Sequence, residues 1–96
     1  MRDYGKVSAK FWIGETGKAL RGNHEAQLPA LYLMTSPHST MTGVYHCPVL
    51  YMAHETGLGF EGASKALQVL QEGGFCLYDE ASEWVFVIRM AAHQID

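Results

Sequence analysis

The chain has 96 residues, enough for one domain with a single modest hydrophobic core. Apolar residues make up 48% of it and charged residues 18%, which excludes a disordered tail, and no apolar run approaches the roughly 18 residues of a membrane-spanning helix. The net charge of −3 conceals an asymmetry: residues 1–22 hold five basic and two acidic residues, whereas residues 23–96 hold two basic and eight acidic ones. A nucleic acid, whose phosphates attract lysine and arginine, would therefore have to be held largely by the N-terminus.

Residues 1–22 are predicted to form a basic arm that packs on the core. We expect a short extended segment around residues 5–8, followed by a turn of helix or irregular chain. Phe11 and Trp12 are large enough to anchor the arm. Its basic residues, interleaved with aromatic ones, fit either a strand of nucleic acid or an ordinary solvated N-terminus whose aromatic side chains pack inward.

The run HEAQLPALYLMT predicts a central helix. Asn23 before it is an N-cap residue, and Glu25 favours the positive end of the helix. Apolar residues occupy most of the circumference, which is typical of a buried helix. Pro29 belongs in the first turn or kinks the helix, and the pair Ser36-Pro37 ends it.

Two more helices are predicted after a short strand at about residues 43–46. Pro48 suits the first turn of a helix over residues 48–56, and Gly57 lies where a left-handed residue is expected to end that helix. The next helix runs from Phe60 to Gln71, and its apolar residues repeat at helical spacing. These predicted core residues are Ala63, Ala66, Leu67 and Leu70.

The segments FCLYD and EWVFVIRM predict two strands joined by a short polar turn. The order of elements, namely helix, short strand, helix, turn, helix and hairpin, is that of a winged helix. We therefore predict an α+β winged helix-turn-helix over residues 23–96, with three core helices and a C-terminal β-hairpin as the wing.

Candidate DNA contacts follow from this arrangement, because the second helix of a helix-turn-helix presents its N-terminal half to the major groove. Ser64, Lys65 and Gln68 lie on the outward face and suit phosphates or base edges. Glu61 and Glu72 on the same helix would repel the DNA backbone.

Phosphate contacts beside that helix are predicted for three lysines of the arm, namely Lys6, Lys10 and Lys18. The hairpin tip over residues 79–83 is acidic, which argues against a phosphate contact by the wing. The tip is either a solvated turn or a contact for a basic partner.

No catalytic residue, metal or cofactor is predicted. The five histidines and two cysteines lack the spacing of a zinc site, no serine has a GxSxG context, and GETGK at residues 14–18 is not followed by the serine or threonine of a phosphate loop. Cys47 and Cys76 have no CxxC spacing, and we expect reduced, buried thiols in a cytoplasmic protein without membrane contact.

The pattern "LYLMTSP…GVY…P…AHETGL…ALQVLQEGGFCLYDE…VFV" covers nearly the whole chain. It resembles the N-terminal winged-helix domain of phage and prophage replication proteins, the replisome-organiser or DnaD-like initiators. The resemblance implies a role in origin-DNA binding, oligomerisation or both, and a partner in the replication machinery. It also leads us to expect either an excised N-terminal domain or a short stand-alone relative.

Two functional hypotheses follow. In the first, a dimeric winged helix of phage replication or regulation binds DNA, because a second subunit doubles the phosphate contacts of a weakly basic monomer. In the second, the same fold is a protein-interaction or oligomerisation module, in which an acidic face meets a basic partner. Trp84 and Phe86 on the last strand would then help to form an oligomer interface.

Overall fold

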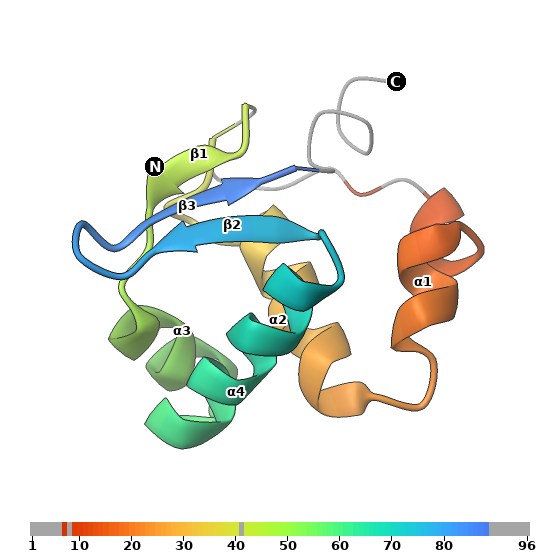
Figure 1. Ribbon diagram of the computed structural model, residues 1–96, viewed down its shortest axis with the longest axis horizontal. Helices are drawn as coiled ribbons and strands as arrows, with labels where there is room; N and C mark the ends of the chain where they lie inside the picture. The colour runs from red at the N-terminus through yellow and green to blue at the C-terminus, as the bar shows by residue number, and fades with distance from the viewer. Residues whose placement is uncertain (1–6, 8, 41, 89–96) are drawn as a thin grey trace.

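The computed structural model describes residues 7, 9–40 and 42–88, and it has an α+β architecture in two layers, helices on one side and a small sheet on the other (Figure 1). The elements in chain order are a 3₁₀ helix η1 (Ala9–Trp12), helices α1 (Glu15–Leu20) and α2 (His24–Thr35), strand β1 (Val44–His46), helices α3 (Val49–Thr56) and α4 (Gly59–Glu72), and strands β2 (Cys76–Asp79) and β3 (Trp84–Val87). The predicted α+β class is confirmed, as is the predicted order of elements from α2 onwards.

Helix α2 lies at the centre of the core, as its nearly all-round apolar character predicts. The Asn23 side chain accepts a hydrogen bond from the Ala26 N–H at 3.2 Å, which is the predicted N-cap. Pro29 lies in the second turn of α2 and is buried, rather than in the first turn. The helix ends before Ser36, whose backbone is extended because a proline follows it.

The C-terminal end of α2 depends on a hydrogen bond from β1. Because residue 37 is proline, it has no N–H to donate to the Leu33 carbonyl in the helical pattern. The hydroxyl of Tyr45 donates to that oxygen at 2.7 Å, and Tyr45 is buried. Desolvation by burial raises the pKa of Tyr45, so the hydroxyl keeps its proton and remains a donor.

Helices α3 and α4 are joined by a turn of two residues. Gly57 adopts the predicted left-handed conformation, with φ of 79°, and its N–H donates to the Ala53 carbonyl at 3.1 Å. The apolar face of α4 packs on α2 and α3, and the four predicted core residues on it are buried: Ala63, Ala66, Leu67 and Leu70.

The sheet is antiparallel with the order β1-β3-β2, so that β3 is central. Tyr45, Val85 and Val87 point into the core against the helices. Val44 of β1 and Leu77 of β2 both pair with Phe86 of β3, and the alternation of strand side chains turns these three residues outward. The sheet therefore covers the helices with one face, and no described helix or strand buries these apolar side chains on the other, which we call the open face.

The arm contains more helix than its sequence predicts, because η1 and α1 pack on each other and α1 also contacts α2. Phe11 anchors the arm as predicted and is 1% exposed, whereas the same prediction for Trp12 is wrong, since Trp12 is 52% exposed. Gly17 permits the close packing: a Cβ atom there would lie 2.1 Å from the Phe11 carbonyl oxygen. Of the predicted extended segment, only Val7 is among the described residues, and it belongs to no helix or strand.

None of the helices in the described part of the chain has the length and apolar character that a bilayer crossing requires.

Candidate functional site

The outward row of α4 carries the DNA contacts that the sequence predicts for this helix. Lys65 and Gln68 are exposed and lie one turn apart on this row. Glu61 and Glu72 are exposed as well, one turn before Lys65 and one turn after Gln68. The row thus offers one positive charge between two negative ones.

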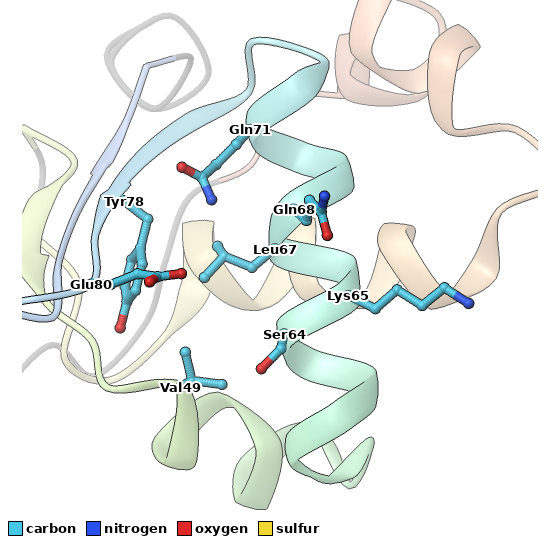
Figure 2. Close-up of a pocket in the computed structure, with 8 residues that line it drawn as sticks. All are labelled: Val49, Ser64, Lys65, Leu67, Gln68, Gln71, Tyr78 and Glu80. Atoms are coloured by element: carbon cyan, nitrogen blue, oxygen red, sulfur yellow. The ribbon is translucent and has the colours of Figure 1, made fainter.

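Beside this row, a hollow of about 570 Å³ separates α4 from the hairpin and the start of α3 (Figure 2). Its lining residues are Val49, Ser64, Lys65, Leu67, Gln68, Gln71, Tyr78 and Glu80. Figure 2 shows Ser64 and Gln71 on the side of α4 that faces the hairpin, whereas the ammonium group of Lys65 points away from the hollow. The structure therefore divides two predicted DNA contacts, Ser64 and Lys65, between different flanks of α4.

A second hollow, of about 340 Å³, continues the first towards the start of α4. The two share Val49, Ser64, Tyr78 and Glu80, and the second adds Leu50, Phe60 and Glu83. We call the joined hollow the hairpin groove. Leu50 is 64% exposed and Phe60 is 59% exposed, so its end nearest α3 is apolar, while Glu80 and Glu83 lie along the side formed by the hairpin.

The hairpin is fixed to the connection between β1 and α3 through the backbone of Cys47. The N–H of Cys47 donates to the Glu83 carbonyl at 2.7 Å, and its carbonyl accepts from the Tyr78 hydroxyl at 2.9 Å. Desolvation by burial raises the pKa of Tyr78 to about 12, which keeps this donor protonated. Both bonds hold the hairpin at a set distance from the first turn of α3.

The turn at the hairpin tip is stabilised by its own side chains. The Asp79 carboxylate accepts from the hydroxyl of Ser82 at 2.6 Å and from the Ser82 N–H at 3.2 Å, and these bonds lower the pKa of Asp79. Glu83 has φ of 63°, a left-handed conformation that the turn imposes. The Asp79 carboxylate thus forms its hydrogen bonds within the turn. Glu80 and Glu83 form no ion pair with any described residue.

The three arm lysines predicted to contact phosphate fall only partly within the described residues. Lys18 is exposed on α1, whose contacts are chiefly with η1 and α2. Lys6 lies outside the described residues, and the side chain of Lys10 does as well. The structure thus neither joins these lysines to Lys65 in one surface nor separates them from it, and their contact with phosphate stays a prediction.

The open face of the sheet is a second candidate surface. Five large apolar side chains lie on it, each between 40% and 58% exposed. They are Val44, Leu77, Trp84, Phe86 and Ile88. The sequence singles out Trp84 and Phe86 for this role. Val44 and Leu77 join them only through the pairing of the strands, and Ile88 follows two residues after Phe86.

Neither cysteine thiol is suited to act as a nucleophile. Cys47 and Cys76 are free and buried, and desolvation raises the pKa of each to about 12, so that the reactive thiolate is scarce at neutral pH. Within the described ranges, no three histidine, cysteine, aspartate or glutamate side chains come together as a metal site would require.

Leu50, Phe60 and Tyr78 are among the groove residues for which the sequence predicts no site role. Apolar residues on a helix are usually buried, and only the folded arrangement of α3, α4 and the hairpin shows that Leu50 and Phe60 are exposed.

Comparison of the chain with protein-family models, with curated proteins and with solved structures finds no match.

Proposed function

We propose that the chain is a winged-helix module of a phage or prophage replication or regulatory protein, and that it binds duplex DNA with α4 in the major groove. The observation that carries this proposal is the exposed pair Lys65 and Gln68 on a helix that follows α3 after a tight left-handed turn at Gly57. Lysine suits the acceptor atoms of guanine, and glutamine suits adenine. At 14 residues, α4 is about 21 Å long, enough to lie across a major groove.

Charge determines how such a module must work. Each phosphate contact by a lysine or arginine releases counterions and adds to affinity, and the row on α4 supplies only Lys65. Glu61 and Glu72 on the same row oppose the approach of DNA. Two subunits acting together, with help from the basic arm, would supply the positive charge that one α4 helix lacks.

Binding to a labelled duplex of mixed sequence, measured by fluorescence anisotropy across a salt series, tests the proposal. We expect binding at about 50 mM salt that weakens steeply by about 200 mM. Lys65→Ala should weaken binding. The slope of log affinity against log salt concentration should also become shallower by about one for each phosphate that is no longer neutralised. Glu72→Ala, a control on the same row, should strengthen binding because it removes a repulsive charge.

Absence of binding at low salt would contradict DNA recognition altogether. Equal affinities of the original chain and Lys65→Ala would instead show that α4 is not the contacting element. A double alanine at Lys6 and Lys10 then reports whether the arm carries the binding.

A second candidate function, association with another protein subunit through the sheet, is favoured by the open apolar face. Contiguous exposed apolar side chains on a folded domain commonly mark interaction surfaces. Phe86 lies at the centre of this face, between Val44 and Leu77, with Trp84 on its own strand and Ile88 directly after that strand. Self-association there is compatible with DNA binding, since the sheet face and α4 lie on different layers of the molecule (Figure 1).

A further inference from the structure

We propose that the hairpin groove binds a basic peptide segment of another protein. The segment seats a large apolar side chain against Leu50 and Phe60 and places lysine or arginine residues beside Glu80 and Glu83. The proposed contacts lie at the end of the groove formed by α3, the start of α4 and the hairpin, beside the Lys65 and Gln68 row rather than on it. The proposal stands whether or not the chain binds DNA.

The apolar part of the groove supplies the anchoring contact. Leu50 and Phe60 project from the first turns of α3 and α4, and more than half of each residue is exposed. The half-buried residues Val49 and Tyr78 line the groove beside them. A leucine or aromatic side chain of a partner would remove much of this apolar area from water, which is the main favourable term in most protein associations.

The charge along the groove selects the partner. Glu80 and Glu83 come from the hairpin, and neither forms an ion pair with a described residue. Lys65 is the one cationic residue among the described residues that line the groove, and Figure 2 shows its ammonium group directed away from the hollow. An approaching phosphate would therefore meet two carboxylates, whereas a lysine or arginine side chain would be attracted by both.

A second copy of the chain is a poorer occupant. A symmetric dimer places the same surface patch of both subunits against each other. Groove-to-groove contact would then bring Glu80 and Glu83 close to the same carboxylates of the other copy. The mainly apolar sheet face offers a copy of the chain a contact with less repulsion, which leaves the groove for a partner of opposite charge.

Selection from a random library of twelve-residue peptides displayed on phage, with the chain immobilised, tests the proposal. The enriched peptides should combine at least one leucine or aromatic residue with two or more lysines or arginines. Peptides enriched without basic residues would overturn the proposal, as would a selection that enriches nothing above the background of an empty surface.

Affinities of a selected peptide for three variants locate the contact. The double variant Glu80→Gln with Glu83→Gln should weaken binding by about threefold to tenfold, the effect expected of two exposed ion pairs. Phe60→Ser should weaken it by about tenfold or more through loss of the apolar anchor. A control, Glu25→Gln with Glu72→Gln, makes the same change of charge on exposed residues that do not line the groove, and it should leave affinity within about twofold.

Equal effects of the two double variants would show that only overall charge attracts the peptide, and would overturn the assignment to the groove. Sedimentation of the chain without peptide tests whether a second copy of the chain occupies the groove. If Phe60→Ser dissociates an oligomer formed by the original chain, a second copy fills the groove and the proposal is wrong. Phe60 and Glu80 are exposed, and circular dichroism melting verifies that the variants fold.

Discussion

At the scale of single residues, the hydroxyl of Tyr45 compensates for a proline in the helical hydrogen-bond pattern. Tyr45→Phe should leave the Leu33 carbonyl without its donor in the core, and a buried unsatisfied acceptor costs about 1–3 kcal/mol. Chemical denaturation should show a loss of that size in the free energy of unfolding. Tyr51→Phe, a matched control at a tyrosine that is 44% exposed, should change it by less than about 0.5 kcal/mol. Equal stabilities of the two variants would contradict this role for Tyr45.

At the scale of elements, the packing of α1 on η1 depends on the absence of a side chain at residue 17. Glycine to alanine in a helix ordinarily stabilises it by about 0.5–1 kcal/mol. At Gly17 the sign should reverse, because the new Cβ atom would lie 2.1 Å from the Phe11 carbonyl oxygen and 2.6 Å from that of Trp12. Thermal unfolding should therefore show a lower midpoint for Gly17→Ala.

The matched control for that substitution lies in α4. A Cβ atom at Gly62 would meet its nearest neighbour, the Cβ of Leu58, at 3.4 Å, which is an ordinary contact. Gly62→Ala should accordingly raise the unfolding midpoint. If Gly17→Ala also raised it, the close approach of α1 to η1 would be refuted.

At the scale of the whole molecule, the open sheet face predicts concentration-dependent association. Sedimentation equilibrium should show a mass above the 10.7 kDa of one chain as concentration rises. Phe86→Lys should weaken self-association by about thirtyfold or more, since it places a charge at the centre of the apolar face. Leu28→Lys makes the same change of charge at an exposed residue of α2 and should leave the mass unchanged. If the unmodified chain stays monomeric at high concentration, the sheet face is not a surface for self-association.

The sequence predicts the elements from α2 onwards because local signals there agree with the final packing. Asn23 caps α2, and Gly57 takes the left-handed conformation that few other residues tolerate. The helix α1 escaped prediction because it is six residues long and contains Gly17, a poor helix former. Its presence depends on contacts with η1 and α2 that no local pattern expresses.

The candidate sites were less predictable than the fold for a related reason. Helical spacing places Ser64 and Lys65 on the outward side of α4, but the position of the hairpin decides which of them faces a groove. Likewise, Phe60 is a large apolar residue of the kind that is usually buried, and its exposure follows only from the arrangement of α3, α4 and the hairpin. The exposure and direction of these side chains depend on segments that are distant in the sequence, so residue spacing within a single helix does not predict them.

The two hydrogen bonds on the backbone of Cys47 affect the thermodynamics of any complex formed at the hairpin groove. Because Glu83 and Tyr78 both hold this residue, the hairpin does not have to be ordered when a ligand arrives. A preorganised groove loses little conformational entropy on association, so more of the contact energy is retained as affinity. Differences between ligands should then appear mainly in how slowly they dissociate, because the surface that they meet is already formed.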